Sequence, residues 1–145
     1  MNFRLQDIRE NMELSQKEVA DILKVSQPTY SRWEKEVEII PLNKLILLAN
    51  YYGISLDYIC NLSNIKKESK AYNYKVDKKI SGNNIVTFRK EKNLTQKELA
   101  LFLNTTPSTV CAYEKGKALI LTSFAYQICK RYNVSMDYIC GITKD

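Results

Sequence analysis

The chain contains an internal repeat: after a shift of 80 positions, residues 5–61 align with residues 85–141 without a gap. Identical stretches include Gln16–Glu18 with Gln96–Glu98 and Asp57–Cys60 with Asp137–Cys140. A gapless match of this length indicates two copies of one fold. A fold of only about 60 residues has a marginal core, so we expect support from the other copy or from a partner chain.

Each copy has the sequence signals of five short helices. The second, third and fifth helices are each preceded by a hydroxyl residue suited to an N-cap. These residues are Ser15, Ser26 and Ser55 in copy one and Thr95, Thr106 and Ser135 in copy two. Glu18 and Glu98 complete capping boxes, and Pro28 and Pro107 fall in the first turn of the third helix, where proline is tolerated. In copy one the first three helices are expected at about residues 3–11, 16–23 and 27–35.

The fourth helix follows Pro41 and places Leu45, Leu48 and Tyr52 at the i, i+3, i+7 spacing of one helix face. It is expected to end at Gly53 in copy one and at Asn133 in copy two, since both residues tolerate the left-handed conformation of a helix end. In copy one this helix is apolar nearly all round, which is typical of a helix buried on more than one side. We therefore expect the fourth and fifth helices to contact copy two or to form a homodimer.

Several classes of function have no support in the residues. The chain has no histidine, no glycine-rich phosphate loop and no C-x-x-C pair, which argues against an enzyme, a zinc site or a bound cofactor. Cys60, Cys129 and Cys140 fall on apolar helical positions and are expected in the core, whereas Cys111 lies on the third helix of copy two, where a redox role is an alternative. No apolar stretch approaches the roughly 20 residues of a membrane span, so we expect a cytoplasmic protein without membrane contact.

The net charge of +6 is unevenly distributed. Residues 1–64 have seven basic and nine acidic side chains, a net charge of −2, while residues 65–84 and 85–145 each have a net charge of +4. We predict a first domain at residues 1–62, a basic linker at 63–83 and a second domain at 84–145. Within the linker, Tyr72, Tyr74 and Val76 alternate, which is a weak strand signal. A flexible linker of about 20 residues spans about 25 Å on average.

Both copies resemble the Cro/repressor-type (Xre-like) family of helix-turn-helix DNA-binding proteins. The matching segments are LSQKEVADILKVSQPTYSRWEKE in copy one and LTQKELALFLNTTPSTVCAYEKGK in copy two. The resemblance covers the chain apart from residues 62–83. It implies an all-α fold of two five-helix, lambda-repressor-like helix-turn-helix domains in tandem. It also implies that the protein binds double-stranded DNA and regulates transcription, more often as a repressor than as an activator.

The resemblance places DNA contacts on the second and third helices of each copy. Gln16 and Gln96 match the family's phosphate-contacting glutamine, and Lys17 and Lys97 can assist them. In copy one Gln27, Ser31 and Arg32 match the base-facing positions, with Thr29 beside them. Glutamine can bind adenine and arginine can bind guanine, each through two hydrogen bonds. The alternative for this face is a solvated surface with capping residues.

Copy two departs from the pattern, because Pro107, Cys111 and Ala112 replace the base-facing residues, with Ser108 and Thr109 beside them. It nevertheless has Lys115 and Lys117 after the third helix, where the family often contacts phosphate. At the corresponding stretch copy one has Glu36 and Glu38, which would repel phosphate. We therefore expect copy one to read bases, and copy two with the linker lysines to supply electrostatic affinity.

Other matched residues are expected to have structural roles. The resemblance implies internal ion pairs between Arg9 and Glu34 and between Arg89 and Glu114, and Trp33 is expected to pack at the edge of the core, as is Tyr113. A second function stays open beside DNA binding: a helix-turn-helix module that regulates through a protein partner. The net negative charge of copy one favours this alternative, while the Gln27 and Arg32 pair opposes it.

Overall fold

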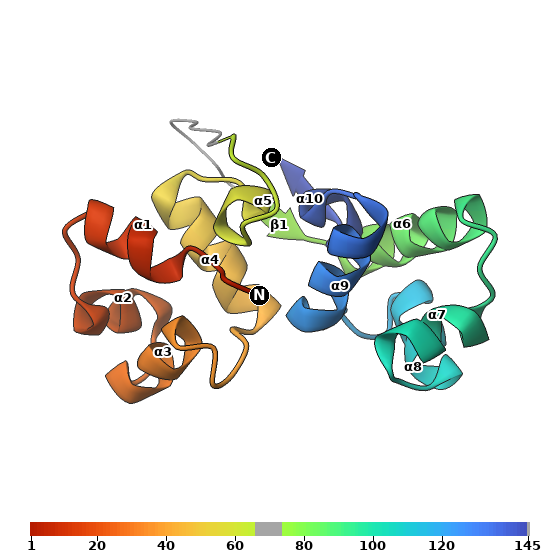
Figure 1. Ribbon diagram of the computed structural model, residues 1–145, viewed down its shortest axis with the longest axis horizontal. Helices are drawn as coiled ribbons and strands as arrows, with labels where there is room; N and C mark the ends of the chain where they lie inside the picture. The colour runs from red at the N-terminus through yellow and green to blue at the C-terminus, as the bar shows by residue number, and fades with distance from the viewer. Residues whose placement is uncertain (66–73, 145) are drawn as a thin grey trace. The chain divides into compact units, whose positions relative to one another are not determined.

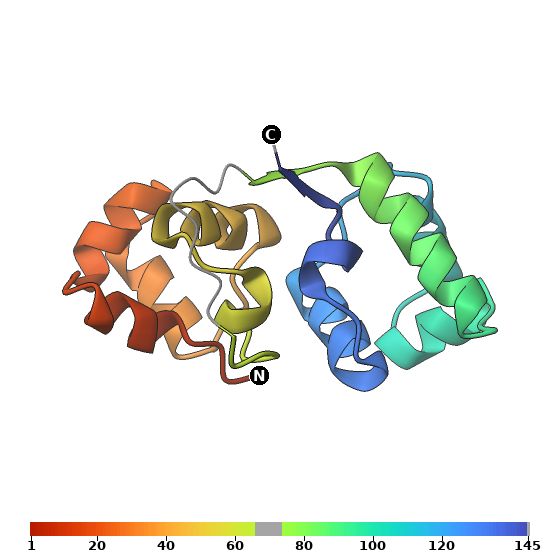
Figure 2. The same cartoon turned by 90° about the horizontal axis from the view of Figure 1, so that it is seen from above.

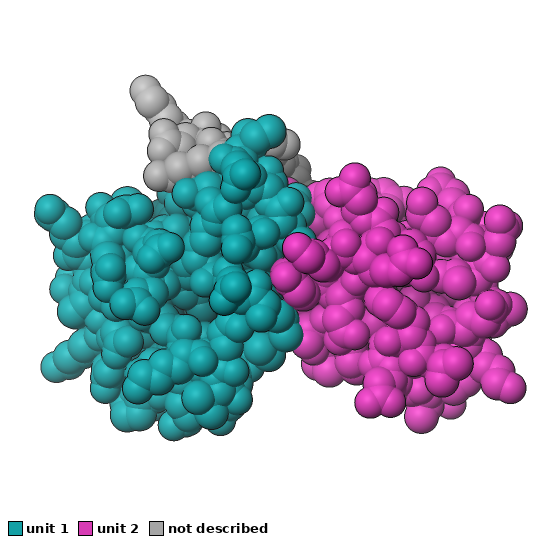
Figure 3. All heavy atoms as spheres, viewed as in Figure 1, with its two compact units in different colours: residues 1–72 teal, residues 73–145 magenta. Residues whose placement is uncertain are grey.

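The structure is a computed structural model that describes residues 1–65 and 74–144. The chain divides into two compact units, residues 1–72 and residues 73–145, which are coloured separately in Figure 3. Within the described residues each unit contains five helices, so the all-α prediction is confirmed. Lys66, Lys67, Lys70 and Tyr72 of the predicted linker lie outside the described residues.

Unit 1 consists of helices alone within residues 1–65 (Figure 1). They are α1 (Leu5–Asn11), α2 (Gln16–Leu23), α3 (Gln27–Glu34), α4 (Leu42–Tyr52) and α5 (Leu56–Ile59). Unit 2 repeats this order and adds one short strand at each end of its helical part. Its elements are β1 (Tyr74–Val76), α6 (Lys78–Glu91), α7 (Gln96–Leu103), α8 (Pro107–Glu114), α9 (Thr122–Tyr132), α10 (Met136–Ile139) and β2 (Ile142–Lys144).

The predicted capping residues determine where the helices begin. The side chains of Ser15 and Thr95 accept hydrogen bonds from the third amides of α2 and α7, and both capping boxes are complete. The other predicted caps accept hydrogen bonds at the starts of α3, α5, α8 and α10. Gly53 and Asn133 adopt the left-handed conformation after α4 and α9, which confirms both predicted helix ends.

The two cores use the same repeat positions. Buried residues of unit 1 recur 80 positions later as buried residues of unit 2, including Leu5 with Ile85, Val19 with Leu99, Leu23 with Leu103, Leu48 with Ile128 and Leu56 with Met136. At other positions a smaller residue in one place of the core accompanies a larger residue in another. Tyr30 and Leu45 become Val110 and Ala125, while Ile8 becomes Phe88. Such exchanges keep a core filled although its residues differ.

The start of unit 2 corrects the predicted linker. Helix α6 begins at Lys78 rather than at about residue 84, because the Asp77 carboxylate accepts hydrogen bonds from the amides of Lys79 (2.8 Å) and Ile80 (3.1 Å). Residues 74–83, which the sequence assigned to the linker, are therefore part of the folded second unit.

A two-stranded antiparallel ribbon joins the ends of unit 2 (Figure 2). Strand β1 pairs with β2 in the register Tyr74↔Lys144, Lys75↔Thr143 and Val76↔Ile142. The alternation of Tyr74 and Val76 thus predicted a real strand, whereas its partner β2 was not expected. The ribbon leads directly into the Asp77 cap, so it fixes where α6 starts.

Candidate nucleic-acid interface

Helices α2 and α3 form a helix-turn-helix in unit 1, and α7 and α8 form one in unit 2. The turn begins with a left-handed residue in both, Lys24 with φ 57° and Asn104 with φ 58°. Helix α3 buries Tyr30 and Trp33, so its opposite face, with Gln27 and Arg32, stays exposed. The burial of Trp33 (5% exposed) and of its counterpart Tyr113 (7%) confirms that both aromatic rings belong to the core.

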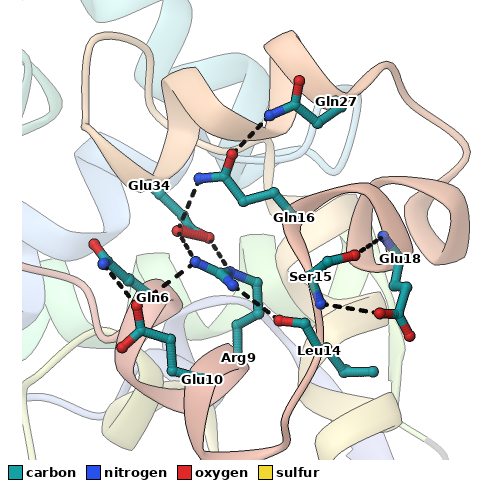
Figure 4. A network of polar contacts seen from close by, with 9 residues as sticks. All are labelled: Gln6, Arg9, Glu10, Leu14, Ser15, Gln16, Glu18, Gln27 and Glu34. Atoms are coloured by element: carbon teal, nitrogen blue, oxygen red, sulfur yellow. Dashed lines mark hydrogen bonds and ion pairs between the residues drawn. The ribbon is translucent and has the colours of Figure 1, made fainter.

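A chain of polar contacts in unit 1 runs from the interior to the exposed end of α3 (Figure 4). The Glu34 side chain is 2% exposed, and its carboxylate accepts two hydrogen bonds from the Arg9 guanidinium, at 2.7 and 3.1 Å. Hydrogen bonding to Glu34 raises the pKa of Arg9. The predicted ion pair is therefore confirmed, and it fixes a buried charge directly behind the helix-turn-helix.

Two glutamines extend this chain to the surface. The Gln16 amide donates to Glu34 (3.3 Å), and its oxygen accepts a hydrogen bond of 2.7 Å from the Gln27 amide. A glutamine amide group has two N–H donors. Each of these two hydrogen bonds uses one N–H of its glutamine, so each side chain has a second N–H to offer. The bond between the two glutamines also fixes their positions relative to each other.

Other predicted contact residues of unit 1 are held by local partners. Arg32 donates to Glu38 (3.2 Å) and to the Thr29 hydroxyl (3.3 Å), and this exposed ion pair is of the kind that contributes little to stability. Thr29 also lies 2.8 Å from the Ser26 hydroxyl at the N-cap of α3. Glu38 thus partly neutralises the arginine that the sequence assigned to base reading. Ser31 is half-buried, Lys17 is exposed, and the DNA role of each predicted residue stays a prediction.

Unit 2 repeats the inner part of the polar chain. Arg89 pairs with Glu114 at 2.6 Å, as predicted, and the Gln96 amide donates to Glu114 at 3.0 Å. The hydrogen bond to Glu114 raises the pKa of Arg89. The outer step has no equivalent, because Pro107 stands where unit 1 has Gln27 and offers no side-chain donor.

A shallow hollow of about 340 Å³ lies at this place on unit 2. It brings together four predicted contact residues, Gln96, Ser108, Lys115 and Lys117. Its remaining lining residues are Pro107, Cys111 and Ala112, which were predicted to be poorly suited to reading bases. Lys97 and Thr109 do not line it, and Thr109 instead lies 3.0 Å from the capping hydroxyl of Thr106. Cys111 is half-buried, while the other three cysteines are buried as predicted.

One basic residue near this surface was placed wrongly by the sequence. Lys79 was assigned to the linker, but the structure packs it against Gly116, where a Cβ atom would lie 3.2 Å from the Lys79 Cα. Gly116 has a φ of +71° and separates Lys115 from Lys117. The Asp77 cap was the available signal, since it starts α6 early enough to carry Lys79 to this loop.

The chain belongs to the helix-turn-helix family, because the family's sequence model matches it twice, over residues 5–59 and 85–139. A 60-residue part, 41% of the chain, is 33% identical to the uncharacterized HTH-type transcriptional regulator YobD of Bacillus subtilis. The match spans 54% of that relative, about half of its length.

Among solved structures, the chain is similar to the clp gene regulator ClgR of Corynebacterium glutamicum. Two crystal structures of that protein each match 45% of this chain at 20% identity. The matches cover 69% and 84% of the chains in those structures, with TM-scores of 0.41 and 0.40. Within the described part of the chain, no helix is both long enough and apolar enough to span a bilayer.

Proposed function

We propose that this protein binds double-stranded DNA in a sequence-dependent manner and represses transcription. The observation that carries the proposal is the polar chain of unit 1, in which the buried Glu34 positions Gln16 and Gln16 positions Gln27. A side chain held in place before binding loses less freedom when it meets a base edge. The exposed face of α3 is the element that enters the major groove, which admits one helix.

The two units contribute differently in this proposal. Unit 1 supplies hydrogen bonds to bases through Gln27 and Arg32, once Arg32 leaves Glu38. Unit 2 supplies phosphate contacts through Lys115 and Lys117, and Lys79 adds a third positive charge to the same loop. Contacts to phosphate give affinity for any duplex, whereas contacts to base edges give sequence preference.

Selection of bound duplexes from a random library tests this proposal. Arg32→Ala and Gln27→Ala should each relax the preference at one base position, at a cost of about 1–3 kcal/mol in discrimination. The matched control is Gln6→Ala, which removes an exposed amide that bonds Glu10 within α1. Wild-type preference in both α3 variants would contradict the proposed reading residues.

A second candidate function is regulation through a protein partner with weak DNA binding or none. The net charge of −2 over residues 1–64 favours it, because an acidic surface is repelled by phosphate. Gel shifts on random duplexes at two salt concentrations separate the two functions. DNA binding through lysines predicts a steep loss of affinity with salt, whereas the absence of any shift at low salt would favour the protein partner.

A further inference from the structure

The hollow on unit 2 arises from side chains, because the helices that carry it match those of unit 1. Helices α3 and α8 have the same length, a capping hydroxyl at the same position and proline in the first turn. The difference is that Gln27 and Arg32 of unit 1 are replaced by Pro107 and Ala112. Shortening these two side chains opens the space that the longer ones occupy in unit 1.

The chemistry of the hollow combines an apolar part with a basic part. Pro107, Cys111 and Ala112 offer apolar or weakly polar surface, Lys115 and Lys117 offer two positive charges, and the remaining lining residues Gln96 and Ser108 are polar. An isolated anion would need only the lysines, and an apolar small molecule would need only Pro107, Cys111 and Ala112. A thymine in a duplex satisfies both parts, because its C5-methyl projects into the major groove between two backbones of phosphates.

We propose that unit 2 recognises thymine through its methyl group, which enters the hollow formed by Pro107, Cys111 and Ala112, while Lys115 and Lys117 contact neighbouring phosphates. Apolar contact of an alanine with this methyl is an established form of base readout and needs no hydrogen bond. Unit 2 thereby gains sequence preference without long polar side chains. This inference rests on the proposed DNA-binding function and names what unit 2 reads.

The hollow has room for a methyl group. A methyl is comparable in size with a water molecule, whose share of liquid volume is about 30 Å³. The hollow of about 340 Å³ is larger and is open to solvent, so the edge of a base can reach it.

Deoxyuridine provides the test, because it pairs like thymidine and lacks only the methyl. The full-length protein is titrated with a duplex selected by the wild type, and each thymidine is replaced in turn. Burial of one carbon group contributes about 0.8 kcal/mol, which corresponds to an affinity loss of about fourfold per methyl. In a duplex that has cytosine in place of a contacted thymine, 5-methylcytosine at that position should restore part of the affinity, because it supplies the missing methyl.

Variants assign the effect to the hollow. Ala112→Arg restores the residue type of unit 1 and should abolish the difference between thymidine and deoxyuridine at the positions read by unit 2. Lys115→Ala should weaken binding to both duplexes equally and leave their ratio unchanged. If Ala112→Arg unfolds unit 2, Pro107→Gln replaces it, since position 107 is exposed and glutamine stands at the equivalent position 27.

The outcomes separate this inference from the proposed function. Equal affinity for the thymidine and deoxyuridine duplexes, with normal DNA binding, overturns methyl recognition and leaves the DNA-binding function standing. A deoxyuridine effect that survives both Ala112→Arg and Pro107→Gln places the methyl contact elsewhere and also overturns the inference. Absence of binding to any duplex at low salt overturns the proposed function, and methyl recognition with it.

Discussion

At the scale of single residues, Glu34 places a buried charge in unit 1, because its carboxylate side chain is only 2% exposed. Its charge is compensated by Arg9, which also donates to the Leu14 carbonyl (2.8 Å) and so joins α1 to the start of the helix-turn-helix. A buried carboxylate without its partner is costly, because neither water nor another charge replaces the lost contact. The pair therefore sets the stability of the element that presents Gln16 and Gln27.

Arg9→Met should lower the free energy of unfolding of unit 1 by about 3–5 kcal/mol, since it leaves Glu34 buried and unpaired. Fluorescence of Trp33 in a urea titration measures this directly, because the chain has one tryptophan and it is buried in α3. Gln6→Ala is the surface control, and Arg9→Met with Glu34→Leu should recover part of the loss. A change below about 1 kcal/mol in the single variant would show that the pair is not structurally important.

The residue scale also shows what the sequence could and could not predict. The partners of Arg9 and Arg89 were predicted because the family resemblance supplies them. The hydrogen bond between Gln16 and Gln27 was not, since it depends on how two helices approach each other in space. The hollow was missed for the same reason. In the sequence, Pro107 and Ala112 indicated only that hydrogen bonds to bases are lost. The structure places them beside Lys115, where together they line a hollow.

At the scale of elements, α6 differs most from its counterpart, since it spans Lys78–Glu91 while α1 spans Leu5–Asn11. The additional turns pack against the end of α8, with Gly82 at the point of closest approach. A Cβ atom on Gly82 would lie 2.6 Å from the carbonyl oxygens of both Tyr113 and Glu114. Glycine is therefore required there, although it weakens a helix interior by about 1 kcal/mol relative to alanine.

Gly82→Ala should destabilise unit 2 by about 1–3 kcal/mol, because the clash with the α8 backbone outweighs the gain in helix propensity. Amide hydrogen exchange followed by mass spectrometry is the suitable measurement, with faster exchange expected in residues 107–114 and no change in residues 27–34. The control is Asn83→Ala on the exposed side of the same helix. Unchanged or slower exchange in α8 of the Gly82 variant would contradict the prediction, because it would mean that unit 2 accommodates the added methyl without losing stability.

Element boundaries were predictable where a cap is local. Ser15, Ser26 and Ser55 gave the starts of their helices because each bonds an amide within three residues. The start of α6 was missed, because Asp77 sits in a lysine-rich segment that reads as linker. Strand β2 was missed because it has three residues and exists through pairing with β1, a contact distant in sequence.

At the scale of the whole molecule, the repeat determined the fold class and the number of units, while the sequence differences between the copies determine their surfaces. Unit 1 exposes Leu47 (46%) and Tyr51 (51%) on one side of α4, and the equivalent residues of unit 2 are Gln127 and Arg131. Ile46 is buried, so the apolar surface of α4 is narrower than the sequence indicated. We propose that Leu47 and Tyr51 take part in association of the protein.

Leu47→Glu with Tyr51→Glu should reduce the average mass in light scattering, because the added charges oppose an apolar contact between two copies of the protein. The matched control is Gln127→Glu with Arg131→Glu, which adds charge at the same positions of unit 2. Wild-type mass in the Leu47 and Tyr51 variant would rule out this contact between copies.

The charge asymmetry between the units leads to a prediction for the intact protein on DNA. Each lysine that neutralises a phosphate contributes about 0.9 to the slope of log affinity against log salt concentration. Lys115→Ala with Lys117→Ala should therefore reduce the slope by about 1.8 and weaken binding to selected and random duplexes alike. Lys130→Ala with Arg131→Ala removes the same charge from α9 of unit 2, outside the surface of α7 and α8, and should change the slope much less. If both double variants lower the slope equally, the overall charge of unit 2 draws the protein to DNA; a loss confined to Lys115 and Lys117 identifies the loop after α8 as its phosphate contact.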